Sequence, residues 1–319
     1  MCVPNMGVSL SAVVLFTTLL LGHFAHSQYD GRENRMASGT DVGPGEAPYQ
    51  ASVRLIEADR HLGSGAILNV RFVISQASFI YKLMRQMPNR ALYSLARVRV
   101  GQSGLKSQAN DQFRPIQSCT FHPEFDFELA QNDVALLKTS SPIELNPLVQ
   151  PIALYRGPIV DGSVVQYTDW GADMVTATQE DFKERLQKMD AQAISNERCK
   201  ELLSAWDLQD FVYDSRVCIY TDGVGSVCTG NVGGPLVIVE DGTPQLVGVM
   251  TYVYRACNST VPAGFERMWD HYGWITTSSK INYKYTDLEQ TCRVVRNVAS
   301  QLQTKKKALR RRRAAKEVN

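Results

Sequence analysis

The sequence predicts an all-β fold, because short apolar runs, turn residues and composition agree. Between residues 49 and 275, short runs rich in Val, Ile, Leu and Tyr alternate with segments containing Gly, Pro, Asn and Asp. Many short strands with such connections are typical of a sandwich or barrel. The chain of 319 residues is 44% hydrophobic, which excludes disorder throughout and suffices for one large core or two small ones. The clearest predicted strands are residues 49–54, 72–75, 96–100, 134–137, 164–167 and 244–254.

Two segments depart from the strand pattern. Residues 179–203 are charged and helix-permissive, and residues 287–303 have apolar residues at helical spacing. We therefore expect a C-terminal helix within an extension of residues 279–304. Residues 305–319 are too charged to pack, so we expect a disordered basic tail. The residues at helical spacing are Leu288, Cys292, Val295, Val298 and Leu302.

The first residues have the features of an export signal. An apolar run covers residues 8–21, and Ala25 and Ser27 are small residues where a signal peptidase requires them. A membrane anchor is the alternative, but the run is shorter than the roughly 20 residues of a spanning helix. We predict a signal peptide of residues 1–27 and a secreted, extracellular protein without a membrane span.

Six cysteines remain after Cys2 leaves with the signal peptide, and an even set in an oxidising compartment predicts disulfides. A metal site would need paired Cys or Cys/His spacing, which these cysteines lack. We expect neither a metal nor a cofactor.

Five motifs occur in the order found in one family of proteases. They are GTDVGPGEAPYQASV (39–53), GAIL with RFVI (65–74), NDVALLK (132–138), DWG (169–171) and CTGNVGGPLV (228–237). On these motifs, residues 35–275 resemble the trypsin/chymotrypsin-like (S1-type) serine proteases. The resemblance implies a domain of residues 36–278 with two six-stranded antiparallel β-barrels, a cleft between them, and a short propeptide-like segment of residues 28–35.

The resemblance also locates the positions of the catalytic triad, in which a histidine deprotonates a serine and an aspartate orients the histidine. The nucleophile position is Val232, whose isopropyl group has no lone pair. The base position, in the segment SQASF (75–79), is Ser78, a neutral hydroxyl that accepts no proton near pH 7. Only Asp133 matches the family. The histidines of the mature chain, His61, His122 and His271, fall at family positions away from this centre.

Other departures agree with a loss of catalysis. Met36 stands where active relatives have the isoleucine that becomes the new N-terminus, and Asn231 replaces the aspartate that pairs with its amine. Gly63 and Phe79 occupy both positions of the disulfide that braces the histidine loop. We therefore predict a pseudo-protease, in which buried Asp133 needs other hydrogen-bond donors. Thr251 and Ser78 are the donors we expect.

The resemblance implies the disulfides Cys199–Cys218 and Cys228–Cys257, which leaves Cys119–Cys292 by elimination, although six cysteines allow 15 pairings. It also implies a pocket with an uncharged floor, which either accepts a small apolar side chain or has collapsed. Asn258 begins a glycosylation sequon beside this pocket. The pocket positions are Ser226, Thr251, Val253 and Ala263.

The C-terminal tail carries a separate signal. Residues 305–316 contain eight Lys and Arg, and Glu317 removes one charge, so that the tail has a charge of +7 and the rest of the chain −5. The tail is a candidate for binding polyanions, a convertase processing site, or a solvated end without a partner. Export argues against nucleic acid. The candidate residues are Lys305, Lys306, Lys307, Arg310, Arg311, Arg312 and Arg313.

The function we predict is that of a non-catalytic serine protease homologue of the insect secreted type, which binds a secreted or cell-surface protein as cofactor, decoy or scaffold. Such homologues occur in seminal fluid and in haemolymph immune cascades. Only residues 28–35 precede Met36, too few for a clip domain, so we favour reproduction over immunity. The alternatives are a polyanion-binding or surface-binding protein and a residual serine endopeptidase.

Overall fold

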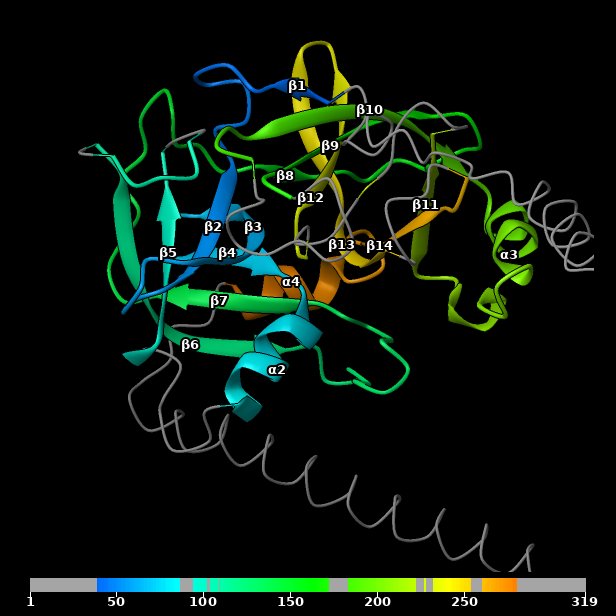
Figure 1. Ribbon diagram of the computed structural model, residues 1–319, viewed down its shortest axis with the longest axis horizontal. Coiled ribbons are helices and arrows are strands. Elements are labelled where there is room, and N and C mark those ends of the chain that lie inside the picture. The colour runs from blue at the N-terminus through cyan, green and yellow to red at the C-terminus, as the bar shows by residue number, and fades with distance from the viewer. Residues whose placement is uncertain are drawn as a thin grey trace, which may run out of the picture. The chain divides into compact units, whose positions relative to one another are not determined.

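The computed structural model describes residues 39–86, 94–101, 104–108, 110–171, 183–221, 227, 232–253 and 260–279. Their strands close into two six-stranded antiparallel barrels (Figure 1), which confirms the predicted fold class. All six strands predicted most clearly from the sequence are present.

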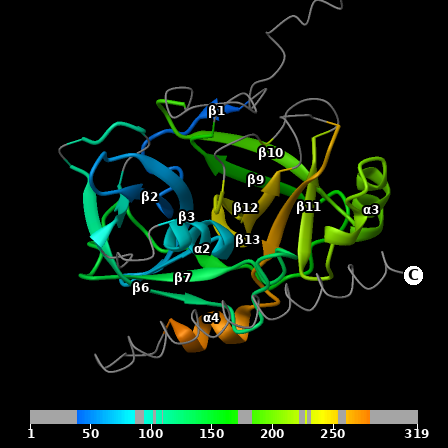
Figure 2. The ribbon, with the colours of Figure 1, turned by 60° about the horizontal axis from the view of Figure 1, so that its bottom comes forward.

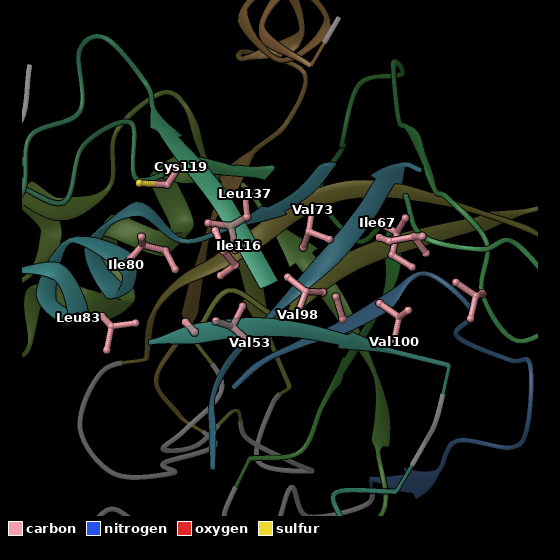
Figure 3. Packing of buried hydrophobic residues seen from close by; sticks show 14 residues of the cluster. Val53, Ile67, Val73, Ile80, Leu83, Val98, Val100, Ile116, Cys119 and Leu137 are labelled. Atoms are coloured by element: carbon pink, nitrogen blue, oxygen red, sulfur yellow. The ribbon is translucent and has the colours of Figure 1, made fainter. Parts of the chain in front are cut away.

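The first barrel has the strand order β2-β3-β4-β7-β6-β5 and closes by pairing of β2 with β5. Alternate side chains point inward and fill it with β-branched residues, as Figure 3 shows for Val53, Ile67, Val98 and Ile116. Its strands are β2 (Gln50–Leu55), β3 (His61–Asn69), β4 (Phe72–Ser75), β5 (Ala96–Val100), β6 (Gln112–Phe121) and β7 (Ala135–Thr139).

The second barrel has the order β9-β10-β11-β14-β13-β12 and closes by pairing of β12 with β9. Tyr167 and Phe265 meet edge to face in its core, with ring centroids 5.4 Å apart. The short strands β1 (Thr40–Asp41) and β8 (Ala153–Leu154) pair with β10 and β13. The barrel strands are β9 (Val164–Asp169), β10 (Gln187–Ile194), β11 (Arg216–Tyr220), β12 (Pro235–Glu240), β13 (Thr243–Val253) and β14 (Ala263–Arg267).

Short helices lie between and after the barrel strands. They are α2 (Ala77–Gln86), α3 (Asn196–Ser204), the 3-10 helix η3 (Gln209–Phe211) and α4 (Tyr272–Ser278). Helix α4, below β6 and β7 in Figure 2, is the C-terminal helix of the described chain and buries Ile275. Among the described residues, no helix has the length and hydropathy needed to cross a membrane. The predicted signal peptide, the helix at 287–303 and the basic tail lie outside these residues.

The prediction that residues 179–203 favour a helix is only partly right. Residues 196–203 do lie in α3, but residues 187–194 form strand β10, which pairs with both β9 and β11. Met189, Ala191 and Ala193 are buried while Asp190 between them is exposed, so the burial has the two-residue period of a strand. The charged residues on the outer face hid this alternation.

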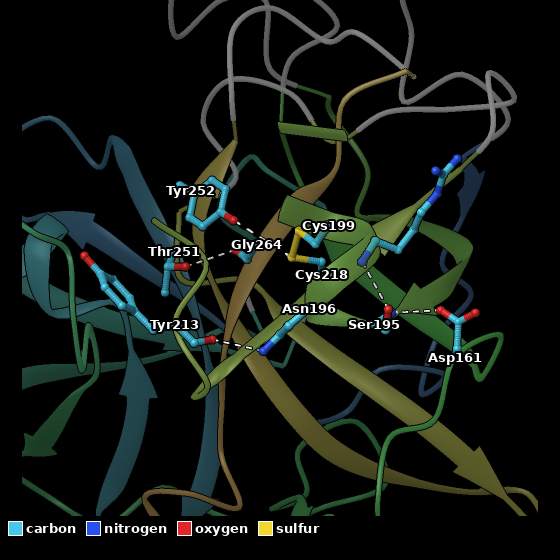
Figure 4. Close-up of a disulfide and its surroundings, with 10 residues drawn as sticks. Asp161, Ser195, Asn196, Cys199, Tyr213, Cys218, Thr251, Tyr252 and Gly264 are labelled. Atoms are coloured by element: carbon cyan, nitrogen blue, oxygen red, sulfur yellow. Dashed lines mark hydrogen bonds between the residues drawn. A yellow bond between two sulfur atoms is a disulfide. The ribbon is translucent and has the colours of Figure 1, made fainter. Parts of the chain in front are cut away.

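The disulfide Cys199–Cys218 is present and joins α3 to β11 (Figure 4), as the resemblance implied. Cys119 is buried on β6, with its Sγ atom 3.6 Å from Sδ of Met84. Its predicted partner Cys292 lies outside the described residues, as do both cysteines of the predicted pair Cys228–Cys257, so these two pairings stay predictions.

Removing the Cys199–Cys218 bond by substituting both cysteines with alanine is expected to lower the free energy of unfolding by about 2–4 kcal/mol, because the unfolded chain loses a cross-link. Urea unfolding measures the change. A wild-type protein reduced at this bond should lose a similar amount, and equal stability of all three forms would contradict the prediction.

Candidate functional site

The three positions that the resemblance assigns to a catalytic triad come from both barrels. Ser78 lies in the first turn of α2, Asp133 two residues before β7, and Val232 in the turn before β12. The main-chain N–H of Ser78 donates to Oδ1 of Asp133 at 2.6 Å. Gly63 leaves room for Val232 and Phe79 together, since a Cβ atom there would lie 2.9 Å from Cγ2 of Val232 and 3.0 Å from Cε1 of Phe79. The phenyl ring therefore fills the space beside Gly63, where the resemblance places the missing disulfide.

Asp133 is completely buried. Burial raises its pKa to about 6, although the N–H of Ser78, the amide of Gln76 and the charge of Arg216 all act to lower it. Nε2 of Gln76 donates to Oδ2 of Asp133 at 2.8 Å. Both carboxylate oxygens thus have donors, neither of which is an imidazole.

Gln76 also connects the barrels, because its Nε2 donates to the main-chain oxygen of Thr251 at 2.6 Å. The expected donors of Asp133 were Ser78 and Thr251. Ser78 is confirmed through its main-chain N–H, but Thr251 is wrong, since its hydroxyl donates to the oxygen of Gly264 at 3.0 Å and accepts from Arg216 at 2.9 Å. The sequence analysis missed Gln76, although a polar residue two positions before Ser78 in a buried turn was an available signal.

An ion pair lies behind Asp133. Nη1 of Arg216 is 2.5 Å from Oε2 of Glu266, and neither side chain is exposed. The two residues are register partners in the antiparallel pair β11–β14. The second oxygen of Glu266 meets Nε2 of His271 at 2.9 Å. Burial acts to raise the pKa of Glu266, but the hydrogen bond of His271 and the charge of Arg216 lower it below its usual value.

This ion pair is tied to the Asp133 loop from two directions. The main-chain N–H of Asp133 donates to Oε2 of Glu266 at 3.3 Å, and Nη2 of Arg216 donates to the main-chain oxygen of Ala130. A buried ion pair needs such additional hydrogen bonds to offset the desolvation of its charges. Asp133 therefore lies in a polar cluster that spans both barrels.

The histidines have partners other than Asp133. Nδ1 of His61 is 2.7 Å from Oγ of Ser52, and burial, with the charges of Arg54 and Arg99, lowers the pKa of His61 to about 3. Nε2 of His271 forms a hydrogen bond with Oε1 of Glu266. The ring of His122 lies 4.8 Å from that of His271, and burial lowers its pKa. In the described ranges, no three His, Cys, Asp or Glu side chains form a group able to hold a metal ion.

Part of the predicted pocket can be placed. Thr251 and Ala263 are buried, and Ala263 pairs with Val253, of which only the backbone is described. The ring of Tyr252 covers Gly264, and its hydroxyl is 4.0 Å from Sγ of Cys218 (Figure 4). Ser226, Asn231, Asn258 and the basic residues of the tail lie outside the described residues.

Replacing Gln76 by leucine is expected to destabilise the protein by about 1–3 kcal/mol, because Oδ2 of Asp133 loses its donor inside the protein. The pKa of Asp133 should rise further above 6. Urea unfolding at pH 7 measures the first effect. Gln166→Leu is the matched control, since Gln166 donates to the exposed carboxylate of Asp190. Equal losses in the two variants would contradict the prediction.

Comparisons with known proteins agree with this architecture. A family model described as Trypsin matches residues 36–275. Trypsin-1 of Astacus astacus is 26% identical over 249 residues, which are 76% of this chain and 100% of the relative. Trypsin of Sus scrofa is 25% identical over 252 residues, 78% of this chain and 98% of the relative. Serine proteinase stubble of Drosophila melanogaster is 27% identical over 253 residues, 76% of this chain but 31% of that protein. Since the family model covers most of the sequence, this chain belongs to the trypsin family.

Proposed function

We propose that this trypsin-family protein is secreted, does not hydrolyse peptide bonds, and acts by binding a protein partner at the cleft between its barrels. The observation that carries the proposal is that both carboxylate oxygens of Asp133 already have hydrogen-bond donors. Its carboxylate accepts from the Gln76 amide and the Ser78 N–H, where a triad needs an imidazole.

The chemistry of the other two positions supports the same proposal. The Val232 side chain has no atom that can attack a carbonyl, and Ser78 has no basic atom. His61, His122 and His271 are each engaged elsewhere, so none of them faces Asp133 as a replacement base. Met36 and Asn231 add the loss of the activation ion pair, as the resemblance implies.

The extracellular setting is supported by the predicted signal peptide and by the Cys199–Cys218 disulfide, a bond typical of oxidising compartments. Within that setting we propose reproductive fluid ahead of haemolymph, with the protein as a cofactor, decoy or scaffold. A glycan on Asn258 beside the pocket would restrict access to the cleft further.

The purified protein should neither react with a serine-directed fluorophosphonate probe nor cleave a broad peptide library, because it lacks an activated nucleophile. Mass spectrometry detects labelling, and pig trypsin serves as the positive control. Labelling of a single residue, together with turnover that disappears when that residue becomes alanine, would instead support a serine endopeptidase.

Binding at the cleft can be tested with a photo-crosslinking amino acid placed at Val232. The matched control position is Val239 on β12, which is 50% exposed. In the native fluid, one secreted protein should be captured from position 232 and not from 239. Identical capture from both positions, or none from 232, would contradict a partner in the cleft.

The basic tail supports a second proposed activity, the binding of sulfated polyanions. Its seven clustered Lys and Arg side chains, 305–307 and 310–313, concentrate positive charge on a chain whose remainder is acidic.

The full chain should therefore bind heparin at low salt and elute as salt screens its charges. A variant with Arg310, Arg311, Arg312 and Arg313 changed to glutamine should elute at much lower salt. Unchanged elution would exclude the tail as the polyanion site, and a mature protein whose mass lacks residues 305–319 would favour a processing site.

A further inference from the structure

A third buried carboxylate lies at the junction of the barrels, in addition to Asp133 and Glu266. Asp169, the last residue of β9, is completely buried. Its Oδ1 accepts from Oγ of Ser64 at 2.7 Å and from the main-chain N–H of Trp170 at 2.6 Å, and its Oδ2 is 2.7 Å from the hydroxyl of Tyr167. Because Ser64 belongs to β3, this carboxylate joins the first barrel to the second.

All three of these partners are neutral, which distinguishes Asp169 from Glu266 with its arginine. The groups that face Asp169 are Ser64 from β3, Tyr167 from its own strand and the following Trp170. His61 packs edge-on against Trp170, with ring centroids 5.4 Å apart, and is uncharged at neutral pH. Within the described part of the chain, no cation compensates Asp169. Ionising a buried carboxyl in such surroundings is costly, and burial raises its pKa to about 7.

The carboxylate also supports the turn that carries Val232. Gly234 has no space for a Cβ atom, which would collide with Oδ2 of Asp169 and the hydroxyl of Tyr167. Ser64 holds the other side of the turn, because its main-chain N–H donates to the oxygen of Val232 at 2.8 Å. Ser64 therefore bonds both Asp169 and the Val232 turn, so that a change in the charge of Asp169 can affect this turn through Ser64.

We propose that Asp169 is a proton-dependent latch between the barrels, which holds β3 to β9 beneath the Val232 turn when protonated and weakens this contact when ionised. In the protonated form, Oδ2 carries the proton and donates it to the Tyr167 oxygen, since a phenol both accepts and donates. Oδ1 continues to accept from Ser64 and Trp170. In the ionised form, the charge is solvated only if the turn moves away from it. The latch does not depend on whether the protein cleaves peptides or binds a partner.

The direction of the pH dependence follows from the two states. The folded protein keeps the proton up to about pH 7, whereas the unfolded chain releases it near 3.8. Between these values the folded state binds one proton more, so the unfolding constant should rise about tenfold for each pH unit. Above pH 7 both states are ionised and the rise ends.

Urea unfolding of the full chain and of Asp169→Asn from pH 5 to 8.5 tests the latch, because asparagine does not titrate. The ratio of their unfolding constants, wild type over variant, should increase about 50-fold from pH 5 to 7 and about 100-fold in all before it levels off near pH 8. Other titrating groups such as His61 cancel in this ratio. A ratio that stays constant over this range would overturn the proposal.

Tyr167→Phe provides a second test, since it removes a donor to the ionised carboxylate. The ratio of unfolding constants is measured again with Tyr167→Phe present in both proteins, with and without Asp169→Asn. The pH at which this ratio levels off should move upward. Tyr155→Phe, which alters an exposed hydroxyl near Glu240, should leave that pH unchanged. Amide hydrogen exchange at Ser64 and Trp170, relative to Asp169→Asn, should accelerate above pH 7. If the asparagine variant does not fold, carboxyl 13C NMR of the wild type decides, because an Asp169 signal that titrates below pH 5 would overturn the latch.

Discussion

The junction of the two barrels is governed by the burial of three carboxylates, each of which must find partners in the interior. Asp133, Asp169 and Glu266 are all inaccessible to solvent. A buried polar group without a partner costs a large part of the stability of an ordinary domain, so their neighbours are constrained. At each carboxylate one bond crosses the junction: Gln76 donates to the oxygen of Thr251, the N–H of Asp133 donates to Glu266, and Ser64 donates to Asp169. Polar bonding, added to two apolar cores, therefore fixes how the barrels meet.

This constraint accounts for the hydrogen bonds of Asp133, whose position the resemblance assigns to a catalytic triad. Without an imidazole, Oδ2 of Asp133 would face the interior unbonded, and the Gln76 amide supplies the missing donor. Gln76 lies two residues before Ser78 and reaches Thr251 as well, so the same side chain replaces a contact and adds a bond between barrels. A histidine at position 78 alone would have to displace that amide. The burial of Asp133 thus accounts for its hydrogen-bond partners.

The sequence predicted the barrels well, because β-branched runs such as residues 72–75 and 96–100 are local signals and the ordered motifs supplied the topology. The charged outer face of β10 concealed its alternation. Ser78, Asp133 and Val232 were found through motifs, whereas Arg216 and Glu266 were missed because their pairing depends on the register of β11 with β14, which residues fifty positions apart do not reveal. Asp169 was recognised only as part of DWG, since its burial depends on contact with β3.

Glu266 and Asp169 differ in the partners of their carboxylates. Glu266 has Arg216 and His271 beside it, which lower its pKa and keep it ionised at neutral pH, so the β11–β14 side and the Asp133 loop are held by fixed charges. Asp169 has hydroxyl and amide donors, which stabilise a carboxylate less than an opposite charge does. The proposed proton dependence of the Val232 turn therefore rests on Asp169, while on the other side burial raises the pKa of Asp133 to about 6. Because Val232 is held through Ser64 and the Asp133 loop through Glu266, the proposed latch acts on the Val232 turn and leaves the ion pair behind Asp133 in place.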